Sequence, residues 1–367
     1  MNVVALALLA GLAADVNLAG SVFLNQASLF ATDANSQAAG ATMRGMNAEA
    51  SVKLVVDVTE HMSASAKICY GCHDFAADQV HLDWTVDEAF NVRFGRFPVP
   101  FGEFYLRHDP ANHRSSSKPL PYMMGRMLRR DVYNLTIIPE PYPDNGVELY
   151  GTLRGDIQEL AYSVYAVSGL KGSAAAGDID FIRSRTEYYA DNNRTPAVGG
   201  RLSWSFFDLP GDVWRWFSVG ASTMYGHYDD DGNLFYWLAG LDLYTRLGQI
   251  NVRGELTMRR TAIPDRPDSY QQVVDDRFTQ REGFYLQADG PLNRYVEWLV
   301  RWDGFRLSGP LRVNSPIPST DSDILRYTGG VALIPGSGVK VKINYEYWRF
   351  SDFSDEHLLH TGLVGSF

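Results

Sequence analysis

Only two cysteines occur among the 367 residues, and the sequence lacks an apolar run long enough for a transmembrane helix. The longest such run, residues 3–14, falls short of the roughly 20 residues that a helix needs to cross a bilayer. No linker rich in Pro, Ser or Gly divides the chain, so we expect one large architecture. Positive charge is also scarce, with 33 Lys plus Arg against 43 Asp plus Glu and a net charge of -10, which argues against nucleic acid as a partner.

Two further absences narrow the choice of function. There is no Gly-x-Ser-x-Gly elbow for a hydrolase nucleophile, and nothing else in the chain indicates a catalytic set, so we predict that the protein is not an enzyme. The sequence also lacks the self-similarity at about 40 residues that a soluble propeller would show.

The sequence does contain many segments in which apolar and polar residues alternate. Residues 339–347 read Val-Lys-Val-Lys-Ile-Asn-Tyr-Glu-Tyr, which places apolar side chains on one face of a strand and Lys340, Lys342, Asn344 and Glu346 on the other. The same pattern predicts sixteen strands, near residues 19–30, 45–58, 64–70, 78–86, 89–98, 145–153, 157–167, 197–207, 215–226, 233–245, 248–260, 282–289, 293–305, 325–334, 338–350 and 355–367.

The connections between these strands alternate between short turns and long loops. The long ones are residues 99–144, 168–196, 261–281 and 306–324. Short periplasmic turns and long outer loops are the rule in transmembrane β-barrels. We therefore predict an all-β fold, a transmembrane antiparallel β-barrel of about 16 strands with both termini periplasmic.

Aromatic residues make up 13% of the chain, and the tryptophans lie near predicted strand ends. Aromatic girdles at the two membrane interfaces would explain this placement. The tryptophans assigned to the girdles are Trp204, Trp214, Trp216, Trp237, Trp298, Trp302 and Trp348.

The two ends of the chain carry features of an exported barrel. Residues 358–367 alternate and end on Phe367, and this stretch resembles the closing strand of bacterial outer-membrane barrels. The resemblance implies the bacterial outer membrane as location, with its lipid and lipopolysaccharide as neighbours. Residues 1–14 look like the core of a signal peptide, but no Lys or Arg precedes Arg44, so the signal either begins further upstream or is only mimicked. Residues 15–367 would then form a single barrel.

The run Gly95-Arg96-Phe97-Pro98-Val99-Pro100-Phe101-Gly102 is followed by a long stretch without a convincing strand. Residues 45–102 resemble the phosphate-selective porin O and P superfamily. In that family a Gly-Arg-Phe run and a Pro-Phe-Gly turn lead into a long loop that folds into the lumen. The resemblance implies that residues 99–144 form a constriction loop, and family analogy suggests a homotrimer.

Basic residues are concentrated in this predicted loop. Rings of Arg or Lys favour anions in a pore, so we interpret the protein as a passive porin for small polar solutes, with anions mildly favoured. Alternatively, the same residues bind lipopolysaccharide phosphates or face solvent. The candidate pore-lining residues are Arg96, Arg107, Arg114, Lys118, Arg126, Arg129 and Arg130.

Both cysteines belong to the motif Cys69-Tyr70-Gly71-Cys72-His73. This spacing is that of covalent c-type haem attachment, with the histidine as an axial iron ligand. It would make the protein an electron-transfer barrel that passes electrons to a partner cytochrome. A disulfide that tightens the connection and a small metal site with His73 are the alternatives. A third class of function is a structural or adhesion barrel with a plugged lumen.

Overall fold

The computed structural model describes residues 15–31, 45–71, 76–123, 136–174, 178–187, 189–207, 214–264, 277–309, 322–351 and 355–367. Residues 1–14, the predicted signal, lie outside these ranges. Within the described ranges, no helix has the length and apolar character needed to cross a membrane.

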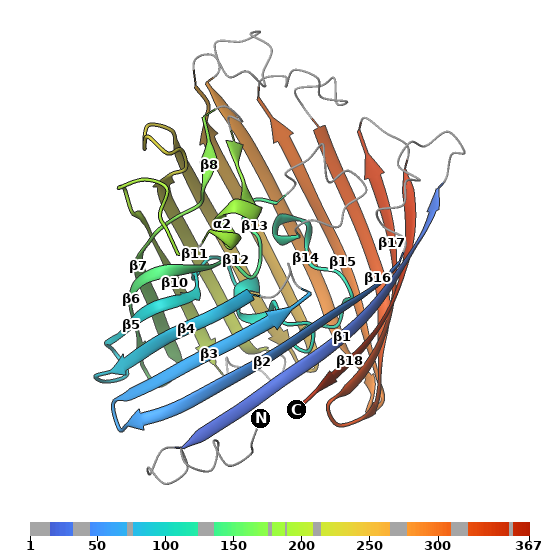
Figure 1. Ribbon diagram of the computed structural model, residues 1–367. Helices are drawn as coiled ribbons and strands as arrows, with labels where there is room; N and C mark the ends of the chain where they lie inside the picture. Colours follow the sequence, from blue (N-terminus) through green and yellow to red (C-terminus); the bar gives the residue numbers. More distant parts are fainter. Residues whose placement is uncertain are drawn as a thin grey trace, which may run out of the picture.

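Sixteen antiparallel strands form a closed barrel, and β1 pairs with β18 to close it (Figure 1). The prediction of a sixteen-stranded antiparallel barrel is confirmed, with strand ends that differ by a few residues. The strands of the barrel are β1 (Val16–Ala31), β2 (Gly45–Thr59), β3 (Met62–Tyr70), β4 (Ala76–Thr85), β5 (Asn91–Pro98), β6 (Pro143–Arg154), β7 (Gln158–Val167), β10 (Ala197–Phe207), β11 (Trp214–His227), β12 (Phe235–Leu247), β13 (Ile250–Ala262), β14 (Phe278–Asn293), β15 (Val296–Ser308), β16 (Ser322–Gly336), β17 (Val339–Phe350) and β18 (Glu356–Ser366).

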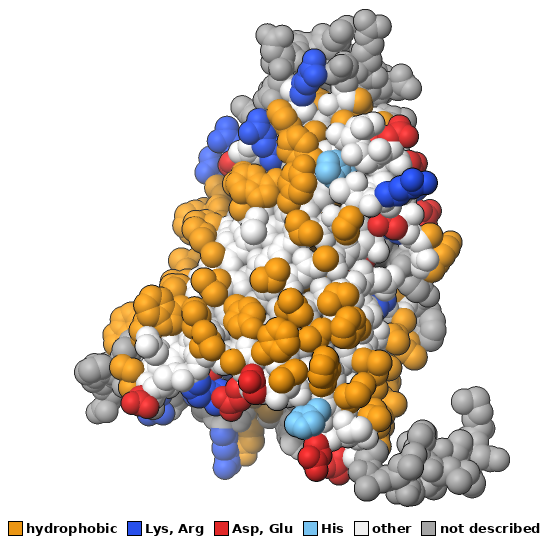
Figure 2. Space-filling model, turned by 90° about the vertical axis from the view of Figure 1, so that its left-hand side faces the viewer, with side chains coloured by type: hydrophobic (Ala, Val, Ile, Leu, Met, Phe, Trp, Pro, Cys, Tyr) orange, Lys and Arg blue, Asp and Glu red, His pale blue; other side chains and the backbone are white. Residues whose placement is uncertain are grey.

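The wall has an apolar outer face and a polar inner face, as the alternation predicts. On β17, Lys342, Asn344 and Glu346 are fully buried inside the barrel, whereas Ile343 and Tyr345 are 38% and 48% exposed on the outside. Figure 2 shows hydrophobic side chains spread over the middle of one side, with most of the charged side chains in view nearer the two ends. This is the distribution that suits a wall surrounded by lipid.

Trp348 is the exception among the tryptophans assigned to the girdles, and for this residue the prediction was wrong. It follows Lys342, Asn344 and Glu346 on the inner face of β17 and is 1% exposed. Its indole Nε1 donates to Glu346 Oε2 at 3.0 Å. Strand parity therefore places Trp348 in the interior, although it lies near a strand end.

The short turns and the long loops lie at opposite ends of the barrel. The hairpins between β12 and β13, β14 and β15, and β16 and β17 each contain two residues, and the start of β1 lies at the same end, where Gly20 N donates to Phe367 O at 3.1 Å. At the other end, two long connections fold back into the barrel. One carries the 3₁₀ helices η3 (Phe104–Arg107) and η4 (Leu120–Tyr122); the other carries β8 (Gly172–Ser173), β9 (Asp178–Ile179) and α2 (Phe181–Thr186).

Candidate constriction site

The loop between β5 and β6 comprises residues 99–142, and the parts of it that the structure describes lie inside the barrel (Figure 1). We call it the constriction loop; the structure describes its residues 99–123 and 136–142. Phe101, Tyr122 and Ile137 have no exposed surface and pack with inward-facing side chains of the wall. The prediction of a long loop that folds inward is confirmed.

Cationic side chains of the wall donate hydrogen bonds to backbone carbonyls of the constriction loop. Lys342 Nζ on β17 donates to the carbonyl oxygens of Pro110 and Ser115, at 2.5 and 3.1 Å. Two arginines, on β15 and β16, do the same: Arg301 Nη1 donates to Ser117 O at 3.0 Å, and Arg326 Nη2 to Lys118 O at 2.6 Å. Further contacts of this kind join Lys340 to Ala111 O and Arg259 to Ile137 O.

Acidic and polar side chains of the wall accept hydrogen bonds from the same loop. Glu255 on β13 accepts from Phe104 N at 2.7 Å, from the Tyr285 hydroxyl at 2.7 Å and from the Tyr122 hydroxyl. Gly102 lies directly beside Glu255 with a φ of +67°, and a Cβ there would collide with both Glu255 and the Tyr122 hydroxyl. Only glycine fits this approach without strain. Similar bonds join Leu120 N to Asp303 and Ser116 N to Asn344.

The constriction loop also reaches the opposite wall at β3. Lys67 Nζ donates to Asp109 Oδ1 at 2.6 Å and lies 3.1 Å from His108 Nε2, and His108 Nδ1 lies 2.6 Å from Tyr105 O. Burial, together with the positive charge of Lys67, lowers the pKa of His108 to about 4. A neutral His108 can then donate from Nδ1 to Tyr105 and accept from Lys67. The loop is therefore tied to both sides of the lumen.

Two of the predicted pore-lining residues lie together at this site. Arg114 bonds to Asp289 Oδ1 at 2.5 Å and to Glu297 Oε1 at 2.7 Å. Arg107 forms an ion pair with Glu103, and its guanidinium carbon lies 4.8 Å from the centre of the Tyr244 ring. Both arginines keep part of their surface exposed, 24% for Arg107 and 19% for Arg114. They line a cavity of about 20 Å³ together with Phe104, Asn112, His113, Arg253, Tyr285, Gln287, Asp289 and Arg301.

Two further predicted residues, Arg96 and Lys118, do not join this cluster. Arg96 is buried in the wall, where its Nε donates to Ala77 O at 2.9 Å. Lys118 Nζ donates to Glu140 O at 2.6 Å, which joins the two described parts of the constriction loop. Arg126, Arg129 and Arg130 lie outside the described residues.

Sequence reasoning missed the wall residues that hold the constriction loop, above all Glu255, Arg301, Arg326 and Lys342. A signal is present in the sequence, because alternation with apolar neighbours puts Glu255, Arg301 and Lys342 on polar strand faces. The missing information was the partner of each side chain. Most of these partners are backbone atoms of the loop, which side-chain chemistry cannot reveal.

The described residues of the cysteine motif, 69–71, lie at the end of β3, at the long-loop end of the barrel. Cys69 is disulfide-bonded and 2% exposed, whereas Cys72 and His73 lie outside the described residues. A disulfide sulfur has no thiol that could add to a haem vinyl group, so a disulfide and a haem thioether exclude each other at Cys69. Among the described residues, no three His, Cys, Asp or Glu side chains are grouped as metal ligands.

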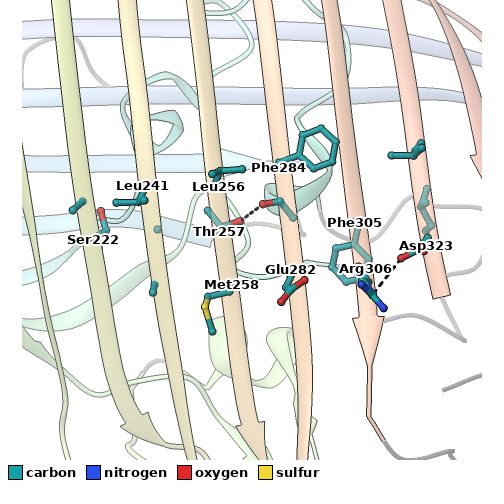
Figure 3. Close-up of a pocket in the computed structure, with 16 residues that line it drawn as sticks. Ser222, Leu241, Leu256, Thr257, Met258, Glu282, Phe284, Phe305, Arg306 and Asp323 are labelled. Carbon is teal, nitrogen blue, oxygen red and sulfur yellow. Dashed lines mark hydrogen bonds and ion pairs between the residues drawn. The ribbon is translucent and has the colours of Figure 1, made fainter. Parts of the chain in front are cut away.

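A groove of about 730 Å³ crosses the outer wall from β11 to β16 (Figure 3). Leu241 and Leu256 border it and are 59% and 61% exposed, so it belongs to the outer surface of the barrel. Its lower edge in Figure 3 is charged, with Glu282 beside the ion pair between Arg306 and Asp323 at 3.6 Å.

No protein-family model matches the sequence, and no curated protein matches it significantly. Solved structures do share the fold. They include the outer membrane channel DcaP of Acinetobacter baumannii (TM-score 0.59, 13% identity, 96% of this chain and 97% of that chain) and an anion-selective porin from Comamonas acidovorans (0.58, 12%, 96% and 100%). The trimer form of OmpT, an outer membrane protein of Vibrio cholerae, gives a TM-score of 0.54 at 10% identity over 96% and 99% of the two chains. At these identities the likeness shows a common barrel fold.

Proposed function

We propose that this protein is a passive outer-membrane channel for small polar solutes, not an enzyme. The observation that supports this proposal is a closed barrel with an apolar outer face, a charged inner face and a loop held across the lumen. A barrel of sixteen strands would otherwise enclose a wide aqueous channel. The loop narrows this space, so the size and charge of a solute would decide its rate of diffusion.

We further propose that the channel favours anions only mildly. Arg107 and Arg114 lie on the constriction loop inside the barrel and keep part of their surface exposed. Their charges are partly balanced by Glu103, Asp289 and Glu297. Such pairing weakens the field that a permeating anion would experience. The anion-selective porin among the structures of the same fold is in line with this proposal.

The apolar outer face of the wall also suggests what surrounds the barrel. Lipid acyl chains and lipopolysaccharide would cover the apolar face, including the groove of Figure 3, and the end with the short turns would face the periplasm. A homotrimer is our proposal for the assembly, since one structure of this fold is described as a trimer form. Crosslinking in native membranes would test this assembly.

Planar-bilayer recording of the purified protein tests the channel function. We expect stable conductance steps and a reversal potential in a salt gradient that is displaced slightly toward the anion. Replacing Arg107 and Arg114 with Glu should move that potential toward cations, as should the same change at Arg126, Arg129 and Arg130. A folded barrel without conductance would overturn the proposal and leave a structural or adhesion role.

A further inference from the structure

A second loop enters the lumen beside the constriction loop. We call residues 168–196 the outer loop; the structure describes its residues 168–174, 178–187 and 189–196. Leu170, Ile179 and Phe181 are at most 3% exposed and belong to the same hydrophobic cluster as Ile137 and Ile138 of the constriction loop. The two loops therefore share one packed interior.

The outer loop is held to the wall near its start and again at Asp178. Near its start, Gly169 N donates to Asp144 Oδ2 at 2.6 Å and Leu170 N donates to the Tyr236 hydroxyl at 2.9 Å. Farther along, Asp178 Oδ2 accepts from Arg281 Nη2 on β14 at 2.5 Å. Because Asp144 is on β6 and Arg281 on β14, the loop spans several strands of the wall.

Arg259 on β13 contacts both loops with one guanidinium group. Its Nη1 donates to Ile137 O of the constriction loop at 3.0 Å, and its Nη2 lies 3.6 Å from Asp178 Oδ1 of the outer loop. The guanidinium carbon also lies 4.8 Å from the centre of the Phe181 ring. The side chain has no exposed surface, and in such surroundings a rigid guanidinium group holds its partners in a defined geometry.

We propose that Arg259 is a positioning residue that couples the two loops, so that the outer loop is a second part of the size filter. This inference rests on the proposed channel function. A loop released at Asp178 would free Arg259 from one partner and weaken its bond to Ile137. The exclusion limit of the channel would then depend on both loops, although Arg107 and Arg114 belong to the constriction loop.

The test compares Arg259→Met with the matched control Arg260→Met. Arg260 is the next residue of β13 and faces outward, with its guanidinium carbon 4.1 Å from the centre of the Phe278 ring. Asp178→Asn is the second test variant, since it weakens the outer-loop side while leaving Arg259 in place. Hydrogen exchange of residues 136–142 and 178–187 reports each loop, and liposome swelling with sugars of increasing size reports the exclusion limit. Heat-modifiable gel migration confirms that each barrel is folded.

We expect Arg259→Met to lower the exchange protection of both loops by about tenfold, the effect of losing one charge-assisted hydrogen bond. Asp178→Asn should lower the exchange protection of the constriction loop as well as that of the outer loop. Both variants should admit larger sugars, Arg260→Met should match the wild type, and Arg259→Lys should restore part of the protection. If Asp178→Asn loosens only the outer loop, or if Arg259→Met matches Arg260→Met, the coupling is wrong. A wild type without conductance would overturn the channel function, while exchange would still decide the coupling.

Discussion

Replacing Glu255 with Gln should loosen the constriction loop at one of its contacts with the wall, without creating a cavity. The glutamine keeps one oxygen for Phe104 N and the Tyr285 hydroxyl, which both bond to Oε1, but it presents an amide NH₂ where Oε2 accepts from Tyr122. Burial and the nearby Glu255 raise the pKa of Tyr122 well above its ordinary value, so its hydroxyl remains a donor. The variant therefore loses one charge-assisted bond between wall and loop.

The expected cost follows from the chemistry of that bond. A hydrogen bond to a charged group contributes about 1.5–3 kcal/mol, which corresponds to roughly tenfold to hundredfold in the docking equilibrium of the loop. Hydrogen exchange of residues 99–123 would measure this loss as reduced protection. Single-channel recordings of the same variant should show greater open-channel noise.

A double-mutant cycle with Tyr122→Phe isolates the bond. Because each single change removes the same interaction, Glu255→Gln and Tyr122→Phe should have similar effects, and the double variant should be little worse than either. Tyr285→Phe is the matched control, since that hydroxyl belongs to the wall and not to the loop. Unchanged protection in both single variants, or simple additivity in the double variant, would refute this account of the docking.

Three further predictions concern other contacts. The pKa of His108 is lowered from 6.5 to about 4 by burial and by Lys67, so the docked state of the constriction loop is fully favoured above pH 6.5 and loses stability as the pH falls toward 4. Channel noise should therefore rise between pH 6.5 and pH 4 in the wild type and stay constant in His108→Gln. A rise that persists in His108→Gln would contradict the assignment to His108. Lys342→Met should loosen the constriction loop more than Lys340→Met, because Lys342 donates to two carbonyls and Lys340 to one. Equal rates of amide hydrogen exchange at Ala111 and Ser115 in the two variants would count against this ranking. For the cysteine motif, the intact mass of protein from native membranes should show a disulfide at Cys69, and its absorption spectrum should show no Soret band. A Soret band with added haem mass would instead support the electron-transfer barrel.

The barrel could be predicted from the sequence because its determinants are local. Alternation along a strand such as β17 directly reports which side chains face outward, since successive residues point to opposite faces. The placement of Trp348 was wrong because position near a strand end was given more weight than parity. The inward course of the constriction loop was suggested by the run from Gly95 to Gly102 and not by periodicity.

The candidate site was less predictable because its contacts join residues far apart in the chain. Arg107 and Arg114 could be selected as cations on a loop, but the acidic partners of Arg114, Asp289 and Glu297, are distant in sequence. The entry of the outer loop into the lumen was not predicted at all. Its anchors are single residues such as Asp178, and an isolated aspartate in a connection has no sequence pattern that distinguishes a buried ion pair from a solvated one.

The wall holds much of the constriction loop through peptide groups, which every residue type provides. Lys342, Arg301 and Arg326 bind carbonyl oxygens, and Asn344 accepts from an amide. Side chains such as those of Arg107 and Arg114 could thus change during evolution while these backbone anchors remained. For the proposed channel, a lineage could acquire a different solute preference by exchanging a few loop residues, with an unchanged barrel as the inherited frame.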